Sequence, residues 1–256
     1  MRRRLPRLVA GLLLGLTLLA AREPQLVPDV SQRHVEIRYS FTGAELLLFG
    51  AILYPDELSR ARNADIVVVV RGPTRSIMVR EKQKIGGIWV NAATMRYRSA
   101  PSFYSVASSR PLKDIVGERT AAIYELGVGN LQLSPASDEA STAATDRFEK
   151  GYIDLLTRNG LFQQEGRGVE ITDGALYRAH IRLPAKVPVG HYSAETFLIR
   201  DGHIIAAAVR DIEISKTGFE RFVAVAADHW PWTYGISAML ISLLSGWAAA
   251  TLFRRL

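Results

Sequence analysis

Cysteine is absent from all 256 residues of the chain. This absence excludes disulfides, thiol nucleophiles, thiolate metal sites and dithiol redox motifs. The standard catalytic and cofactor patterns are also missing, namely the G-x-S-x-G elbow, S-x-x-K, H-E-x-x-H and the P-loop. We therefore expect no catalytic residue, no bound metal and no cofactor, and we expect stability to come from ordinary hydrophobic cores.

Acidic residues are absent from both ends of the chain, and this absence explains the formal net charge of +7. Residues 1–22 and 254–255 hold seven arginines and no acid, whereas residues 23–229 hold 25 basic and 25 acidic residues. The basicity therefore belongs to the ends of the chain. Because no aromatic residues are interleaved with basic ones in the middle, we predict no nucleic-acid partner.

The first 21 residues have the layout of a secretory signal peptide. Residues 1–21 combine a basic start, an apolar stretch and small residues at Ala20 and Ala21. The apolar stretch is short for a membrane-spanning helix. Leu19 fits the small-x-small rule for cleavage poorly, so an uncleaved N-terminal anchor is the alternative.

The C-terminal end has the features of a single membrane span. Tyr234–Phe253 contains no charge, and about 20 apolar residues are enough for a helix to cross a bilayer. Aromatic residues precede this run, and Arg254 and Arg255 follow it, as the positive-inside rule expects for a cytoplasmic C-terminus. We predict a transmembrane helix at 231–254 in a bacterial inner membrane, with a periplasmic ectodomain.

Small residues recur every four positions along the expected span. They are Ala238, Ser242, Gly246 and Ala250. Such a stripe lets helices approach one another closely. We predict that it contacts either a multispan membrane protein or a second copy of the chain as a homodimer.

Residues 22–117 carry the signals of a first β-sandwich-like domain. Val35, Ile37 and Tyr39 alternate with polar residues, as in a half-buried strand. The runs at 45–52 and 65–73 are nearly unbroken in apolar character, which predicts strands buried on both faces. Shorter strands are expected around Ser76–Arg80, Gly87–Val90 and Ser102–Ala107.

Residues 118–164 form a helical connection in this prediction. Four apolar residues recur at helical spacing, and Asn159-Gly160 is a plausible C-terminal stop. The four are Phe148, Tyr152, Leu155 and Leu156. We expect this helix to cover the outer face of the first sheet, which would bury the central strands on both sides.

Residues 165–217 again have the patterns of strands. Apolar and polar residues alternate strictly at 176–183, and Asp201-Gly202 predicts the turn of a hairpin. A short juxtamembrane helix is expected at 218–230. The fold class is thus mainly β, with one or two β-sandwich (Ig-like) domains, a few helices and a C-terminal transmembrane helix. Whether the two β regions are separate domains stays open at this point.

Basic residues are concentrated between positions 71 and 113, where nine basic residues accompany a single acid. We predict an anion-binding or partner-binding face, and its candidate residues are Arg71, Arg75, Arg80, Lys82 and Lys84. Residues 114–173 carry an excess of acids. The alternatives are that the two stretches pair with each other or that both are solvated.

Glu45 stands at the head of one apolar run, and Arg71 ends the other. If these runs are adjacent antiparallel strands, the two charges meet at the margin of the sheet. We therefore predict a structural ion pair between Glu45 and Arg71. A catalytic carboxylate would need a second acid, a base or a metal beside it, and the sequence shows none.

Three histidines define the enzymatic alternative. His191 and His203 flank the expected hairpin, and His180 lies on a neighbouring strand. A three-histidine zinc site at this hairpin would fit a metal-assisted periplasmic hydrolase. The plainer interpretation is that these are polar residues on solvated strand faces.

Several blocks together resemble one family. They are FTGAELLLFGAI, DIVVVVRGP, GIWVN (87–91), PSFYSVASSRPL (101–112), LPAKVPVGHY (183–192) and the closing GW…FRR. From about Pro28 to the C-terminus the chain resembles the alphaproteobacterial putative transmembrane protein family, which consists of predicted membrane proteins of this length. The resemblance implies no established activity and no catalytic residues. It also implies an accessory role near the transport of a sulfur oxyanion.

The function expected from these features is a non-catalytic, membrane-anchored periplasmic accessory module. It docks on an inner-membrane partner, for which an anion or sulfur-oxyanion permease is the first candidate. The alternatives are the metal-assisted hydrolase and a self-associating structural envelope protein.

Overall fold

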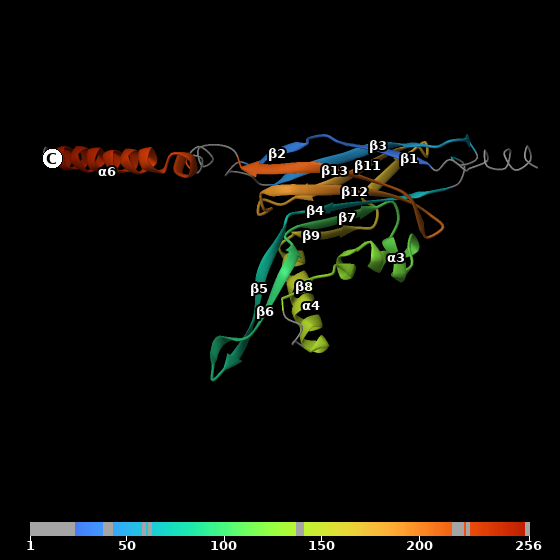
Figure 1. Cartoon of the computed structure of the whole chain (residues 1–256), viewed down its shortest axis with the longest axis horizontal. Helices are drawn as coiled ribbons and strands as arrows, with labels where there is room; N and C mark the ends of the chain where they lie inside the picture. The colour runs from blue at the N-terminus through green and yellow to red at the C-terminus, as the bar shows by residue number, and fades with distance from the viewer. Residues whose placement is uncertain are drawn as a thin grey trace, which may run out of the picture.

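A computed structural model describes residues 24–37, 43–57, 60, 63–136, 141–216, 223 and 226–253. Two β-sheets lie against each other, a long β-hairpin projects from them, and an apolar helix stands near the C-terminus (Figure 1). The expected signal peptide at 1–21 lies outside the described residues, as do Arg254 and Arg255. Within the expected juxtamembrane helix at 218–230, residues 226–229 are helical and most of the others lie outside the described residues.

The two sheets of the sandwich share strands from both halves of the chain. The four-stranded sheet has the order β1 (Gln25–Val30), β3 (Ala44–Leu53), β11 (Leu176–Leu183) and β10 (Val169–Thr172), and all of its pairs are antiparallel. The six-stranded sheet has the order β2 (His34–Ile37), β13 (His203–Lys216), β12 (Gly190–Arg200), β4 (Asp65–Arg71), β7 (Tyr104–Ser108) and β9 (Phe162–Glu165). Its β2–β13 and β7–β9 pairs are parallel.

This strand order brings the expected first β domain at 22–117 and the expected second β region at 165–217 into the same two sheets. Strand β11 pairs with β3 in one sheet, and β12 pairs with β4 in the other. Because each of the two sheets contains strands from both regions, the regions form one sandwich. The expected hairpin at Asp201-Gly202 is confirmed as the β12–β13 turn.

Strand β4 lies at the centre of the hydrophobic core and is buried on both faces. Ile66, Val68 and Val70 face the four-stranded sheet, where they join a cluster that includes Leu48 and Ile181. Residues 67 and 69 belong to a second cluster on the opposite face of the six-stranded sheet. All the side chains of 66–70 are at most 1% exposed, which confirms burial on both faces for the apolar part of 65–73.

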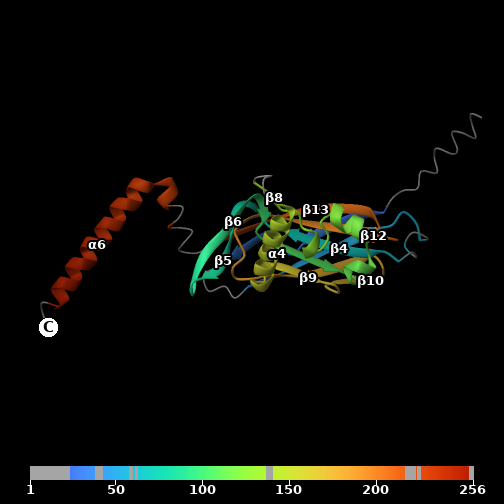
Figure 2. The ribbon, with the colours of Figure 1, turned by 90° about the horizontal axis from the view of Figure 1, so that it is seen from below.

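Helices cover the outer face of the six-stranded sheet, as expected. They are η1 (Leu112–Asp114), α3 (Glu118–Ile123), η2 (Val128–Asn130) and α4 (Thr142–Arg158). Viewed from below, α4 lies in front of this sheet (Figure 2). Tyr152 of α4 meets Phe162 of β9 edge to face, with ring centroids 5.8 Å apart. The expected burial is confirmed for Phe148 and Tyr152, whereas Leu155 is exposed.

Helix α4 begins and ends at residues that suit its termini. The Ser141 side chain accepts a hydrogen bond from the Ala144 N–H, which satisfies one of the unpaired donors of the first turn. Asn159 is the C-terminal cap, and Gly160 follows with a positive φ of 69°. The stop predicted at Asn159-Gly160 is thereby confirmed.

Strand β3 departs from the expectation of burial on both faces. Leu46 and Leu48 point into the core, but Phe49 and Leu53 lie on the outer face and are 39% and 52% exposed. Its composition resembles that of β4, yet no element among the described residues covers the outer face of its sheet. The burial expected for 45–52 is therefore wrong for that face.

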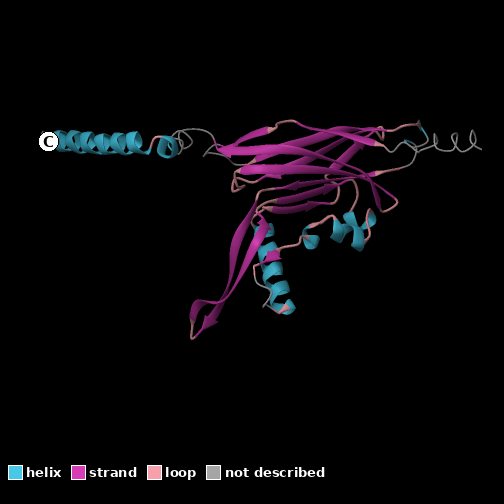
Figure 3. Cartoon of the chain, viewed as in Figure 1, coloured by secondary structure: helices cyan, strands magenta, loops and turns pink. Residues whose placement is uncertain are grey.

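A long β-hairpin, which we call the arm, projects from the sandwich. It consists of β5 (Thr74–Ile85) and β6 (Ile88–Pro101), and short β8 (Ser134–Pro135) pairs with its base. Figure 3 shows the two strands running away from the sheets beside α4. Gly86 and Gly87 connect them with φ values of 58° and 88°, as a two-residue turn with two positive φ angles requires.

The arm leaves the sandwich at a tight corner, where the connection from β4 to β5 lies against the connection from β6 to β7. The Gly72 N–H donates to the Phe103 carbonyl at 2.9 Å, and the Ser102 hydroxyl donates to the Pro73 carbonyl at 2.6 Å. A Cβ at position 72 would lie 2.8 Å from the Phe103 Cβ and 2.9 Å from the Tyr192 ring. Glycine is thus required where these two connections pass close to each other.

Helix α6 (Pro231–Phe253) is the candidate membrane span. Its stretch Pro231–Thr251 is long and apolar enough to cross a membrane, and none of it is buried against the rest of the chain. The mainly β fold with a C-terminal apolar helix is thus as expected.

Candidate functional site

The outward face of the arm carries cations in a row. Arg80, Lys82 and Lys84 alternate along β5 and are all exposed, because successive residues of a strand point to opposite faces. Across the hairpin, Met78 lies opposite Arg96, which is also exposed. We call Arg80, Lys82, Lys84 and Arg96 the basic face.

The inward face of the arm is apolar at its base. Ile77 and Val79 pack against the cluster under α4, together with buried Met95. Glu81 also points inward, where its carboxylate lies 3.1 Å from the Arg147 guanidinium of α4. The only acid of the arm is therefore neutralised from the inside. Among the described residues, no carboxylate lies within ion-pair distance of the basic face.

The structure divides the predicted binding set into two groups. Arg71 lies at the end of β4, away from the basic face, and its side chain is only 26% exposed. Arg75 lies at the base of the arm, where its guanidinium donates to the Val189 carbonyl at 3.3 Å. Only Arg80, Lys82 and Lys84 remain together on an exposed surface without acidic partners among the described residues.

Arg71 belongs to a half-buried network with two acids. Its Nη1 donates to Glu125 Oε2 at 3.0 Å, and its Nη2 donates to the Tyr124 carbonyl at 3.0 Å and lies 3.8 Å from Glu195 Oε2. Beside it, the buried Tyr104 hydroxyl donates to the Glu125 carbonyl and accepts from the Gly127 N–H. This network fixes the loop after α3 to the six-stranded sheet.

The predicted ion pair between Glu45 and Arg71 is wrong. The strands that carry them, β3 and β4, belong to different sheets and are not neighbours. Glu45 instead places Oε1 2.8 Å from Nδ1 of His180 on the adjacent strand β11. Glu45 is therefore at the solvated end of an inner strand of the four-stranded sheet and has a different partner.

The three histidines of the enzymatic alternative do not converge. His191 and His203 lie at opposite ends of the β12–β13 hairpin, opposite Glu213 and Arg200 respectively. His180 lies in the other sheet. The described part of the chain contains no group of three or more His, Asp or Glu residues that could hold a metal ion. His191 and His203 cannot meet across the hairpin, because its residues pair at equal distances from the turn. His203 directly follows the turn, whereas His191 lies near the far end of β12.

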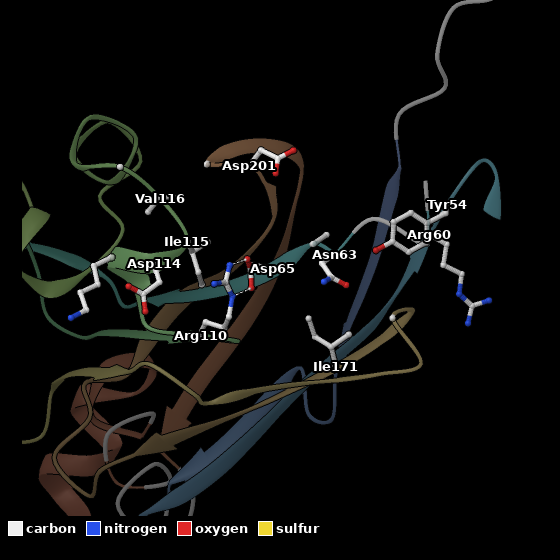
Figure 4. Close-up of a pocket in the computed structure, with 15 residues that line it drawn as sticks. Tyr54, Arg60, Asn63, Asp65, Arg110, Asp114, Ile115, Val116, Ile171 and Asp201 are labelled. Carbon is white, nitrogen blue, oxygen red and sulfur yellow. Dashed lines mark hydrogen bonds and ion pairs between the residues drawn. The ribbon is translucent and has the colours of Figure 1, made fainter. Parts of the chain in front are cut away.

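A cavity of about 940 Å³ opens at the end of the sandwich near the β12–β13 turn (Figure 4). Its charged lining consists of Arg60, Asp65, Arg110, Lys113, Asp114 and Asp201. Arg110 is held by Asp65, with Nε 2.9 Å from Oδ1, and Arg60 donates to the Asp173 carbonyl at 2.8 Å. Because three bases face three acids, this cavity has no net charge to select an anion.

Asp65 shapes this cavity by its contacts with Arg110 and Ser109. Burial alone would raise the pKa of Asp65, but hydrogen bonds from the Arg110 guanidinium and the Ser109 hydroxyl outweigh it and hold the pKa below its usual value. A carboxyl group with a lowered pKa stabilises the fold above its unfolded-state pKa, near pH 4, and this stabilisation is lost as the pH falls through the folded-state value.

We expect Asp65→Asn to lower the free energy of unfolding at pH 7 by about 1–2 kcal/mol, because a charge-assisted pair with a partly exposed arginine is lost. The difference between variant and parent should shrink as the pH falls below about 4. Urea denaturation of the full-length protein in detergent at several pH values measures it. A difference that stays constant down to acid pH would contradict this assignment.

The exposed apolar tip of the arm was not predicted from the sequence. Ile85, Ile88, Trp89 and Val90 surround the Gly86-Gly87 turn and are 59%, 69%, 66% and 39% exposed. The signal was present as a glycine pair between two strand patterns, which is typical of a two-residue hairpin turn. The expected short strands at Ser76–Arg80 and Gly87–Val90 are in fact parts of this one hairpin.

The small-residue stripe lies along helix α6. Ala238, Ser242, Gly246 and Ala250 are all exposed, and the Ser242 hydroxyl donates to the Ala238 carbonyl within the helix. No described residue of the chain packs on the stripe. Its contact with another helix stays a prediction.

Fold and site together define a mainly β protein with a projecting basic arm and one C-terminal helix fit to cross a membrane. The family model described as "Putative transmembrane protein (Alph_Pro_TM)" matches residues 25–255, and the chain belongs to that family. This confirms the family inferred from the sequence blocks.

Other comparisons add little to this membership. No curated protein matches the chain. Among solved structures, the chain is similar to the crystal structure of Spo0M, a sporulation control protein from Bacillus subtilis, with 8% sequence identity and a TM-score of 0.31. The match covers 81% of this chain and 56% of that one. A likeness at this level carries no argument about fold or function.

Proposed function

We propose that this protein is a non-catalytic, single-pass accessory module of the bacterial inner membrane that docks on an integral membrane partner through the basic face of its arm. The observation that carries the proposal is the exposed row of Arg80, Lys82, Lys84 and Arg96, which lacks acidic partners among the described residues. A row of uncompensated cations on a projecting element favours an acidic partner surface and speeds its encounter.

The proposed orientation has the sandwich in the periplasm and the C-terminus in the cytoplasm. Two arginines at 254–255 follow the candidate span, and an acid and aromatic residues precede it. The basic N-terminal segment at 1–21 agrees with export of the sandwich. The small-residue stripe on α6 supports a second contact with the same partner inside the bilayer. A permease for an anion, in particular a sulfur oxyanion, is the first partner to test.

The test is capture of the partner from the native membrane. The full-length protein carrying Arg80→Glu, Lys82→Glu and Lys84→Glu is compared with its parent by mild crosslinking, affinity purification and mass spectrometry. We expect one multispan protein to be recovered with the parent and its recovery to fall at least about tenfold with the variant, because each reversed charge now repels the acidic partner surface.

A matched variant separates an effect of the arm from a general effect of net charge. Arg119→Glu, Arg167→Glu and Lys186→Glu change the net charge equally at exposed positions outside the arm. We expect this variant to capture the partner as the parent does. Equal recovery with all three proteins would overturn the assignment of the docking face, and recovery of only the protein itself with the parent would favour the self-associating alternative.

A further inference from the structure

The arm ends in large apolar side chains that are mostly exposed. Ile85, Ile88 and Trp89 are each more than half exposed, and they lie at the extremity of a hairpin that projects from the sandwich (Figures 1 and 3). The nearby Gly86 and Gly87 would meet no atom within 4 Å if they carried a Cβ. The tip is thus convex and open on all sides, unlike a groove that receives a ligand.

Two lysines of the basic face follow directly behind this tip. Lys84 lies opposite Trp89 in the antiparallel register, and Lys82 lies opposite Asn91 one step further from the tip. Side chains that face each other in this way project from the same side of the hairpin. The order along the arm is therefore apolar residues first, then a tryptophan beside a lysine, and then further cations.

This order matches the layers of a bilayer surface. Apolar side chains favour the acyl boundary, the tryptophan ring favours the headgroup level, and lysine ammonium groups reach phosphates while their stems stay along apolar surface. A negatively charged lipid surface also attracts each nearby lysine. Charge and polarity thus complement an anionic membrane in the same orientation of the arm.

The membrane lies within reach of the arm. Fourteen residues, 217–230, connect β13 to α6, and a chain of this length spans at most about 50 Å. Strand β5 has 12 residues, which correspond to about 40 Å of extended strand. A sandwich held this closely to α6 can place the tip on the same bilayer.

We infer that the tip of the arm inserts into the surface of an anionic bilayer, with Lys82 and Lys84 on the lipid phosphates. The ectodomain then has two membrane attachments, α6 and the arm, and its orientation over the bilayer is fixed. This inference goes beyond the proposed function, because it requires lipid alone and no protein partner.

The absence of cysteine makes the test specific. Ile88→Cys carries a single environment-sensitive fluorophore at the tip, and Met78→Cys carries it at the base of the same arm. The full-length labelled proteins are placed in nanodiscs of phosphatidylcholine, alone or mixed with phosphatidylglycerol. We expect a blue shift of emission and quenching by spin-labelled lipid at position 88 in the mixed discs only, with no change at position 78.

Neutral variants measure the role of Lys82 and Lys84. Lys82→Gln with Lys84→Gln should lower the ratio of inserted to free tips about 30-fold, which corresponds to about 1 kcal/mol for each lysine near an anionic surface. Arg119→Gln with Lys186→Gln, which removes two exposed charges elsewhere, should leave the ratio unchanged.

The same experiment overturns the inference in two ways. A label at position 88 that stays in water in both lipids would show that the tip does not insert. Burial of this label only in discs made from native membranes would show that the tip contacts a protein. The first outcome does not bear on capture of the partner by the basic face, since discs of phosphatidylcholine and phosphatidylglycerol contain no partner.

Discussion

Phe103→Ala is expected to lower the free energy of unfolding by about 3–5 kcal/mol, because a fully buried ring is removed from a core that cannot close over the cavity. Phe103 is 0% exposed and meets Tyr192 with ring centroids 5.8 Å apart. Its carbonyl also accepts the hydrogen bond from Gly72. Urea denaturation of the full-length protein in detergent, followed by near-ultraviolet circular dichroism, measures the change.

The same substitution on the outer face of β3 is the control. Phe49 is 39% exposed, so Phe49→Ala should cost about 1 kcal/mol or less. The two variants delete the same atoms from a strand or strand end of the same sandwich, and they differ in burial. Equal losses for Phe49→Ala and Phe103→Ala would contradict the placement of Phe103 in the core.

Phe103 also matters for the arm, because it stands where the arm leaves the sandwich. We expect Phe103→Ala to loosen this corner, whereas the hydrogen bond between Ser102 and Pro73 persists. Spin labels on cysteines introduced at Ile88 and at Lys186 would report the distance between the tip and the sandwich. A broader distance distribution in Phe103→Ala than in Phe49→Ala is the expected result.

Local features of the fold were predictable from the sequence wherever short-range physics decides them. The valine run of β4, the stop of α4 at Asn159-Gly160 and the Asp201-Gly202 turn all follow from side-chain shape and backbone preference. The apolar run of β3 gave the same signal as that of β4. The two strands differ in burial because helices cover only the six-stranded sheet, and this coverage is a property of the whole fold.

Long-range pairing was not predictable in the same way. The expected Glu45–Arg71 pair required β3 and β4 to be neighbours, but strand order is set by how all the strands share two sheets. The basic stretch was predicted as one surface, yet the corner at Gly72 sends Arg71 into the sandwich and Arg80 onto the arm. A change in direction of the backbone therefore divided a continuous charge pattern into a structural part and an exposed part.

Arg71→Met is expected to lower the free energy of unfolding by about 2–3 kcal/mol, because it leaves two half-buried carboxylates without their cation. Glu125 and Glu195 are 25% and 24% exposed and both face the Arg71 guanidinium. The loss is smaller than for a fully buried pair, because water reaches the carboxylates in part. The hydrogen bonds from Arg71 to Glu125 and to the Tyr124 carbonyl are lost as well.

A combined variant decides whether unpaired charge is the cause. Arg71→Met with Glu125→Gln and Glu195→Gln removes all three charges, and it should recover most of the stability, within about 1 kcal/mol of the parent. Urea denaturation at pH 7 measures both variants under the same conditions. If the single and the combined variants are equally destabilised, packing of the arginine stem and its contact with Tyr124 hold the loop after α3, and charge compensation does not. Recovery in the combined variant would instead make Arg71 a structural cation, which leaves Arg80, Lys82 and Lys84 as the members of the predicted set that are free to bind.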